Sequence, residues 1–147
     1  MNELYNVCTL CPRKCHINRN LTTGICNNTS SIKVARSALH YFEEPSISGS
    51  NGSGTIFFSG CNLKCCYCQN KEISTNNFGI NISIKRLSEL MLDLQSKKAN
   101  NINLVTPTHF VPSIIEAIKL ARRNGLTIPI VYNTSGYESV DTIKLLD

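Results

Sequence analysis

Three cysteines in the middle of the chain, Cys61, Cys65 and Cys68, have the spacing Cys-x3-Cys-x2-Cys and follow an apolar run over residues 54–59. A cubane cluster contains four iron atoms, so three thiolates leave one iron without a protein ligand. A metal site that lacks one protein ligand is able to bind another molecule at the open position. The spacing therefore predicts a reactive 4Fe-4S site.

Other interpretations of this loop remain open at the level of the sequence. Adjacent side chains diverge, so we expect Cys66 not to be a ligand, although a set made of Cys61, Cys66 and Cys68 is conceivable. A structural zinc site or a disulfide-closed loop would also fit such a short spacing. The cubane remains our prediction.

A second set of cysteines lies near the N-terminus with the spacing Cys-x2-Cys-x3-Cys-x10-Cys, and its members are Cys8, Cys11, Cys15 and Cys26. Four thiolates complete a tetrahedral zinc site or hold a second iron-sulfur cluster, and the spacing does not decide between them. Because no ligand position stays open, we expect a structural or electron-relay role. His16 is a weak further candidate ligand, and two disulfides are the alternative.

Composition limits the class of protein. The chain has 147 residues, of which 41% are hydrophobic and 17% charged, as is usual for one globular domain. It has no apolar run of transmembrane length and begins without a secretory signal, so we expect a cytoplasmic protein with reduced cysteines and no membrane partner. The net charge of +5 is scattered along the sequence, which argues against a nucleic-acid partner.

Strands alternate with amphipathic helices after the cysteine loop. Ser83 can cap one helix, Pro112 suits the first turn of a second, and a third begins near Val140. Short strands are expected over residues 102–106 and 127–133. The apolar positions of the three helices are Ile84, Leu87, Leu90, Met91 and Leu94; Ile114, Ile115, Ile118 and Ala121; and Val140, Ile143 and Leu146. This alternation predicts an α/β fold with parallel strands and right-handed crossovers.

Three polar segments follow the expected strands, namely the cysteine loop and residues 106–109 and 133–137. Because chemistry gathers at the carboxyl ends of parallel strands, we expect these segments to open on one rim. The candidate cofactor contacts in them are Thr106, Thr108, His109 and Asn133. A supporting hydrogen-bonding role for His109 and a turn-forming role for Asn133 are equally compatible with the sequence.

The turn-rich stretch over residues 46–53 marks a junction. We therefore predict a cysteine-rich metal-binding leader over residues 1–53 and a catalytic core over residues 54–147. A short strand over residues 32–36 is expected within the leader.

The loop from Gly60 to Asn70, with Tyr67 directly before Cys68, resembles the signature of the radical S-adenosylmethionine (radical SAM) superfamily. The resemblance implies that the open iron is chelated by the amino and carboxylate groups of S-adenosylmethionine. One electron from the cluster then cleaves the sulfonium and gives a 5'-deoxyadenosyl radical. It also implies that Tyr67 lies against the adenine, and that residues 54–147 form the first three units of a (β/α) barrel.

Within this superfamily the chain most resembles proteins like the pyruvate formate-lyase activating enzyme, in a branch with an N-terminal cysteine motif. Residues 8–15, 103–110 and 132–137 carry the resemblance. It implies an oxidoreductase that receives electrons from a donor such as flavodoxin or ferredoxin and that has a protein substrate, activated at a glycine. True glycyl-radical activases have Gly-Gly-Glu where this chain has residues 106–109, and they place extra clusters after the radical loop. These departures leave the substrate unassigned.

Two other classes of function remain. The chain could be a non-catalytic iron-sulfur electron carrier, or a zinc-ribbon interaction module. The length of the chain also matters. A complete barrel has eight strand and helix units in about 250 residues, whereas this sequence predicts three such units. We therefore expect a truncated or split form with little activity of its own.

Overall fold

The computed structural model describes residues 2–146, and the side chain of Asn2 is not described. The strands are β1 (Ile32–His40), β2 (Ser53–Phe58), β3 (Ile80–Ile82), β4 (Ile102–Val105) and β5 (Ile130–Asn133). The α-helices are α1 (Pro45–Ser48), α2 (Lys71–Ser74), α3 (Ile84–Ser96), α4 (Val111–Arg123) and α5 (Val140–Ile143). Short 3-10 helices are η1 (Asn2–Tyr5), η2 (Thr108–Phe110) and η3 (Lys144–Leu146).

The five strands form one mixed sheet in the order β3-β1-β2-β4-β5. Strands β2, β4 and β5 are parallel, as the alternation of strands and helices predicted. Strand β1 runs antiparallel to both of its neighbours, β2 and β3. The α/β class is thus confirmed, and the sheet is compatible with part of a (β/α) barrel, whereas closure into a barrel is not confirmed.

Strand β1 belongs to the segment that the sequence assigned to the leader. It is longer than the predicted strand over residues 32–36, and its register pairs Val34 with Phe58 and His40 with Ser53. It therefore lies inside the sheet rather than beside it. The division into a leader and a core at residue 53 stays a prediction.

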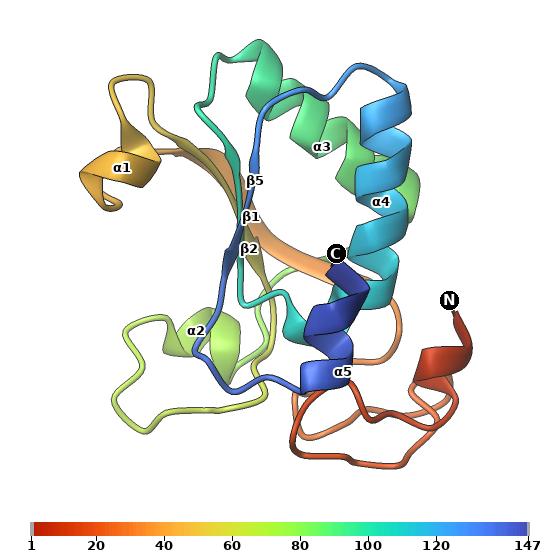
Figure 1. The fold of residues 1–147 in the computed structure, drawn as a ribbon. Helices are drawn as coiled ribbons and strands as arrows, with labels where there is room; N and C mark the ends of the chain where they lie inside the picture. The colour runs from red at the N-terminus through yellow and green to blue at the C-terminus, as the bar shows by residue number, and fades with distance from the viewer. Residues whose placement is uncertain (1, 147) are drawn as a thin grey trace.

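Helices α3 and α4 pack on the same face of the sheet, as Figure 1 shows. Helix α3 begins where predicted, because the Ser83 hydroxyl accepts a hydrogen bond from the backbone nitrogen of Arg86 at 3.1 Å. Helix α4 carries Pro112 in its first turn, where the missing N–H donor costs no hydrogen bond. The core between helices and sheet is formed by residues such as Val34, Ile56, Phe58, Leu87, Met91, Leu94, Ile102, Leu104, Ile114 and Ala117. Burial of these apolar side chains fixes the sheet that positions the cysteine loop.

The loop after β2, the N-terminal segment and helix α5 all lie at one end of the sheet, the lower end in Figure 1. This is the end at which β2, β4 and β5 finish, in agreement with the predicted rim. Among the helices described for residues 2–146, none combines the length and the apolar character needed to cross a membrane.

Candidate metal centre

The cysteine loop leaves the sheet at Gly60, directly after β2. Gly60 has a positive φ of 78°, and a Cβ atom there would collide with Nδ2 of Asn28 and the carbonyl oxygen of Cys26. Both the conformation and the close approach require glycine at this position. The start of the loop is therefore packed against the N-terminal cysteine segment.

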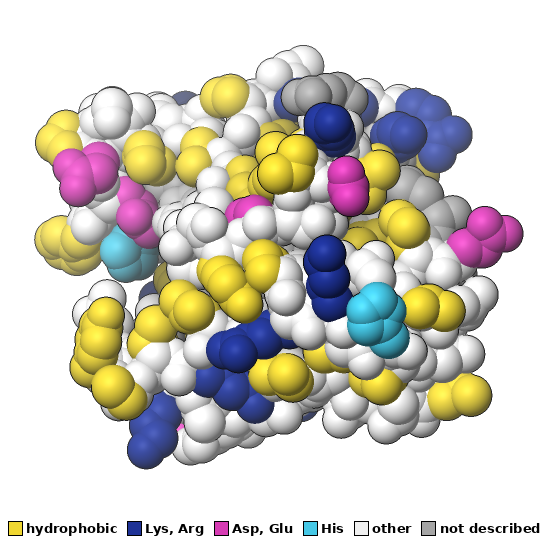
Figure 2. All heavy atoms as spheres, turned by 60° about the horizontal axis from the view of Figure 1, so that its bottom comes forward, with side chains coloured by type: hydrophobic (Ala, Val, Ile, Leu, Met, Phe, Trp, Pro, Cys, Tyr) yellow, Lys and Arg dark blue, Asp and Glu magenta, His cyan; other side chains and the backbone are white. Residues whose placement is uncertain are grey.

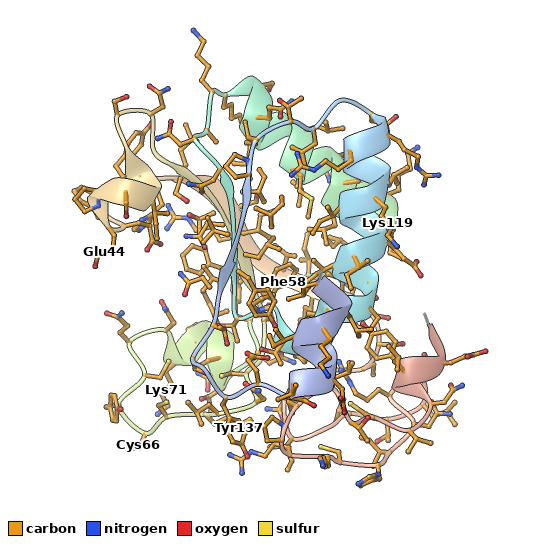
Figure 3. All side chains as sticks on the ribbon, viewed as in Figure 1. Glu44, Phe58, Cys66, Lys71, Lys119 and Tyr137 are labelled. Carbon is orange, nitrogen blue, oxygen red and sulfur yellow. The ribbon has the colours of Figure 1, made fainter. Side chains whose placement is uncertain are left out.

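One cavity of about 160 Å³ is lined by Cys61, Cys65 and Cys68. The other walls come from the ends of the parallel strands and the residues after them, and they include Phe57, Phe58, Val105, Thr106 and Ser135. Cys66 is exposed and does not line this cavity, and Figure 3 shows it at the outer edge of the loop. The structure thus brings together the three predicted ligands and leaves out the fourth cysteine of the loop, while the ligand assignment itself stays a prediction.

Two of the three thiols have a hydrogen-bond donor next to them. The backbone nitrogen of Leu63 lies 3.4 Å from Sγ of Cys61, and the Ser74 hydroxyl lies 3.3 Å from Sγ of Cys68. Such donors stabilise thiolate charge and tune the potential of iron-sulfur clusters. These donors and the shared cavity fit a cubane bound by three thiolates.

No group of three or more His, Cys, Asp or Glu side chains within residues 2–146 is arranged to hold a single metal ion. In a cubane each thiolate binds a different iron, so the ligands need not converge on one point. The absence of a converging set among residues 2–146 is therefore compatible with the predicted cubane.

Tyr67 lies outside the cavity, and 87% of its side chain is exposed. It borders an open depression on the outer side of the loop together with Cys65, Cys68, Gln69 and Asn70. The predicted contact between Tyr67 and adenine stays a prediction.

Thr106 is the one predicted cofactor contact that lines the cavity with the cysteines, counting only residues within the described range. It has a positive φ of 57°, and its backbone nitrogen donates to the carbonyl oxygen of Asn133 at 2.9 Å. This bond joins the residue after β4 to the last residue of β5, so the two predicted rim segments begin side by side. Asn133 itself is half-buried and does not line the cavity.

Thr108 is buried and binds a carboxylate that the sequence analysis did not single out. Its hydroxyl donates to Oε1 of Glu138 at 2.6 Å, and the Tyr132 hydroxyl lies 3.3 Å from Oε2 of the same carboxylate. Thr134 also donates to Glu138. Burial raises the pKa of Tyr132, and the charge of Glu138 acts in the same direction, so Tyr132 stays a neutral donor. Glu138 therefore fixes the loop after β5 on the end of β4.

His109 is buried beneath the loop and does not line the cavity. Its Nε2 lies 2.8 Å from the carbonyl oxygen of Ser59, the residue before Gly60. Burial, with a contribution from the charge of Arg19, lowers the pKa of His109 to about 3. The neutral ring can then donate through Nε2, and Nδ1 has no hydrogen-bond partner among the described residues. In this structure His109 supports the end of β2.

The four N-terminal cysteines gather in one segment. Cys8, Cys11 and Cys26 are buried and Cys15 is half-buried. The Sγ atoms of Cys15 and Cys26 each lie 3.6 Å from the position that a Cβ atom would take at Gly24. Burial raises the pKa of Cys11 and of Cys26, and in both cases the thiols of Cys8 and Cys15 act in the same direction. His16 is exposed.

Arg13, which lies between Cys11 and Cys15, connects the two cysteine segments. Its Nε donates to the carbonyl oxygen of Asn62 at 2.9 Å, and its guanidinium lies over the Tyr137 ring at 5.5 Å. The Asn62 side chain, which is buried, donates to the carbonyl oxygen of Tyr137 at 2.9 Å. Figure 3 shows Tyr137 at the lower end of the molecule, close to the N-terminal segment. Sequence reasoning did not identify Arg13 or Asn62, although their place within the cysteine motifs was a usable signal.

The surface around this end is rich in cations. Figure 2, in which this end comes forward, shows Lys and Arg side chains interspersed with hydrophobic ones. Arg13, Lys14 and Lys71 are exposed there, next to or within the two cysteine segments.

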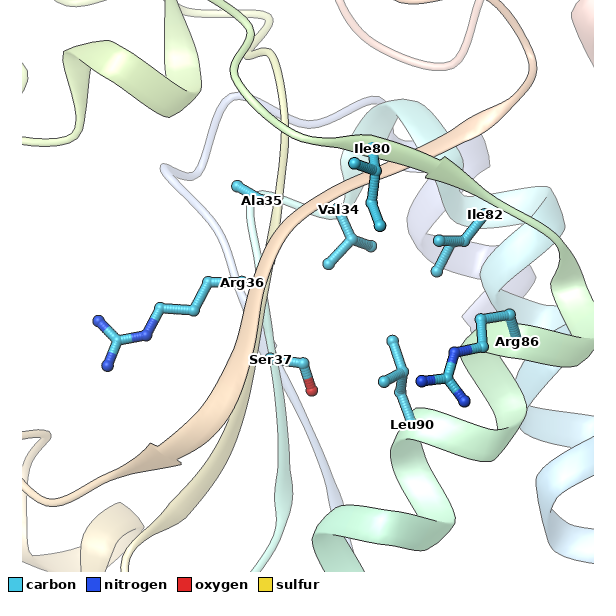
Figure 4. Close-up of a pocket in the computed structure, with 8 residues that line it drawn as sticks. All are labelled: Val34, Ala35, Arg36, Ser37, Ile80, Ile82, Arg86 and Leu90. Carbon is cyan, nitrogen blue, oxygen red and sulfur yellow. The ribbon is translucent and has the colours of Figure 1, made fainter.

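Another cavity, of about 190 Å³, lies away from the cysteines between β1, β3 and α3. Figure 4 shows Val34, Ile82 and Leu90 pointing toward this space and Arg36 pointing away from it. Its lining is mostly apolar, and it contains no group suited to bind metal. We assign the chemistry of the protein to the cysteine-lined end.

Comparison with known proteins agrees with this placement. Residues 55–147, more than half of the chain, match the radical SAM superfamily. Uncharacterized protein MJ0674 of Methanocaldococcus jannaschii is 31% identical over 152 aligned residues, which cover 98% of this chain and 43% of that relative. The chain therefore spans less than half the length of this relative, and no solved structure matches it significantly. Proteins of the matched superfamily generally use a 4Fe-4S cluster and S-adenosylmethionine, and the chain belongs to the radical SAM superfamily.

Proposed function

We propose that this chain binds a 4Fe-4S cluster through Cys61, Cys65 and Cys68 and takes part in the reductive cleavage of S-adenosylmethionine. The observation that supports the proposal most directly is that these three cysteines line one cavity while Cys66 lies outside it. When bound, the cluster would supply the electron that cleaves the sulfonium to methionine and a 5'-deoxyadenosyl radical.

The residues of the chain prepare the site for that chemistry. Leu63 and Ser74 place hydrogen-bond donors beside the sulfurs of Cys61 and Cys68. Thr106 and Ser135 bring polar groups from the ends of β4 and β5 to the same cavity. The buried apolar side chain of Phe58 closes the cavity from the side of the core and limits the access of water.

The test is anaerobic reconstitution followed by reduction with dithionite in the presence of S-adenosylmethionine. Alanine replacement of Cys61, Cys65 or Cys68 should abolish both the visible absorption of the loop cluster and the formation of 5'-deoxyadenosine. Cys66→Ala is the matched control and should change neither. A cluster that is retained without cleavage of S-adenosylmethionine would favour the electron carrier, and loss of the cluster on Cys66→Ala would overturn the ligand set.

We further propose that the electron donor is an acidic protein such as flavodoxin or ferredoxin, and that the substrate is a partner protein activated at glycine. The exposed cations Arg13, Lys14 and Lys71 beside the cysteine segments support an acidic donor. The rate of reduction by flavodoxin should then fall steeply with ionic strength, whereas reduction by dithionite should depend on it much less. Proteins labelled with α-deuterated glycine should transfer deuterium to 5'-deoxyadenosine, and absence of transfer would exclude glycine as the site of abstraction.

A further inference from the structure

Arg19 is fully buried. The ion pairs that the structure shows among residues 2–146 do not include it. A cation buried without a counter-charge is strongly unfavourable in a protein interior. The position of Arg19 therefore calls for negative charge nearby.

The hydrogen bonds of Arg19 engage all three of its guanidinium nitrogens but leave its charge uncompensated. Nε donates to the carbonyl oxygen of Asn28 at 3.0 Å, and the two terminal nitrogens donate to the carbonyl oxygens of His109 at 2.6 Å and Thr29 at 2.5 Å. The guanidinium also lies over the rings of Tyr5 and Phe110, at 5.1 and 5.7 Å. All of these partners are formally neutral. They hold the guanidinium in place without cancelling its charge.

A sulfur of the N-terminal cysteines lies beside the guanidinium and can carry a negative charge. One terminal nitrogen of Arg19 lies 4.0 Å from Sγ of Cys8. The backbone of Arg19 donates to the carbonyl oxygen of Tyr5 at 2.7 Å and accepts from the nitrogen of Ser30 at 2.8 Å, which fixes it beside the cysteines. Four thiolates around a divalent metal ion, or around a doubly charged cubane, carry two units of net negative charge.

We infer that Cys8, Cys11, Cys15 and Cys26 bind a metal centre of net negative charge and that Arg19 is its buried counter-ion. A single zinc ion and a 4Fe-4S cubane share the required chemistry. Zinc would draw the four sulfurs onto one point, whereas a cubane spreads them over four irons. Arg19 also ties this centre to His109, and thereby to the sheet under the cysteine loop. The inference does not depend on cleavage of S-adenosylmethionine.

The first test uses the full chain with Cys61, Cys65 and Cys68 all replaced by alanine, so that only the N-terminal set remains. After anaerobic purification and reconstitution, metal analysis should find either one zinc, without colour, or four irons with matching sulfide and visible absorption. Further replacement of Cys8 and Cys11 by alanine should remove the metal, and Cys66→Ala should not. A metal-free protein with its N-terminal thiols paired in disulfides would overturn the inference.

The second test isolates the charge of Arg19 in the same background. Arg19→Gln removes the charge and Arg19→Lys keeps it. Competition with a chelator should show a metal affinity about 10- to 100-fold lower for Arg19→Gln, the range typical when a residue that supports metal ligands is lost. The affinity of Arg19→Lys should stay closer to that of the protein with Arg19. Equal affinities for both variants would exclude the counter-ion role. If Arg19→Gln does not fold, the metal affinity of Arg19→Lys is measured at low and at high salt. A buried charge pair responds only weakly to salt, so a nearly constant affinity is expected and a steep fall with salt would contradict the counter-ion role.

Discussion

The guanidinium of Arg13 donates a hydrogen bond to the carbonyl oxygen of Asn62 at 2.9 Å, and each residue lies within one of the two cysteine segments. Arg13 lies two residues after Cys11, and Asn62 directly follows Cys61. A second nitrogen of Arg13 lies 3.5 Å from the carbonyl oxygen of Leu63, whose own backbone nitrogen points to the thiol of Cys61. The N-terminal segment thus holds the backbone of the cysteine loop at the point where the first thiol is oriented.

Removal of this contact should loosen the loop without unfolding the protein. For Arg13→Met we expect the iron of the loop cluster to be lost to a chelator several-fold faster, because the carbonyls of Asn62 and Leu63 lose their donor. Lys14→Met, at the neighbouring exposed position, is the control and should behave like the wild type. Equal rates of loss in all three proteins would show that the contact does not constrain the loop.

The Ser74 hydroxyl should tune the potential of a cluster held by Cys68. It lies 3.3 Å from Sγ, and a donor at that position favours the more negative, reduced state. Ser74→Ala should lower the reduction potential by tens of millivolts, the size expected when a hydrogen bond of about 1 kcal/mol is lost. Spectroelectrochemical titration measures it. Ser96→Ala on α3 removes a remote hydroxyl and should leave the potential unchanged.

Burial of His109 should make the stability of the protein depend on pH. Its folded-state pKa is lowered to about 3 from the ordinary value of 6.5, so between these values the unfolded chain binds the additional proton. Stability therefore rises with pH through this window and is lost as the pH falls below 6.5. We expect His109 to account for a loss of about 1 kcal/mol in unfolding free energy between pH 7 and pH 5.5.

Denaturant unfolding of the wild type and His109→Gln at both pH values isolates this contribution. The glutamine amide can still donate to the carbonyl oxygen of Ser59, while it cannot titrate. The variant should lose about 1 kcal/mol less than the wild type over the interval. Identical losses would show that His109 is not the buried titrating group.

Asn103 on β4 is fully buried, and neither atom of its side-chain amide has a hydrogen-bond partner within the described residues. A buried amide without partners is costly, so Asn103→Leu, which is similar in shape, should raise the unfolding free energy of this chain by about 1 to 3 kcal/mol. Denaturant unfolding measures the change. Ser88→Ala on α3 provides a buried control outside the sheet. A destabilised Asn103→Leu protein would mean that the amide is satisfied in solution.

Local sequence patterns were sufficient to predict the regular elements of the core. The spacing of Leu87, Met91 and Leu94 predicted α3, and Ser83 predicted its start, because both signals act within a few residues. Strand β5 is shorter than predicted and begins at Ile130, since Pro129 uses only its carbonyl oxygen, as an acceptor for Ile102. Helix α5 begins at Val140, where the sequence placed it.

The features that the sequence did not predict depend on contacts between distant residues. The position of β1 between β3 and β2 follows from pairing across the sheet, which no local pattern of residues 32–40 contains. Arg19 reads in the sequence as an ordinary polar residue of a loop, and its burial arises only when η2 and α4 pack against the N-terminal segment. The cysteine spacings predicted a ligand set, which stays a prediction, whereas the groups beside those cysteines had to be seen in three dimensions.

The close packing of Gly60 against Cys26 and Asn28 has a consequence for how the two cysteine segments fold. A side chain at position 60 would collide with Asn28 and with the backbone of Cys26, so the cysteine loop lies directly on the N-terminal segment. Asn28 in turn donates to the carbonyl oxygen of Ser59, the residue before Gly60. Each segment therefore completes its packing only when the other is present, and neither set of cysteines is held in its final position by its own local sequence.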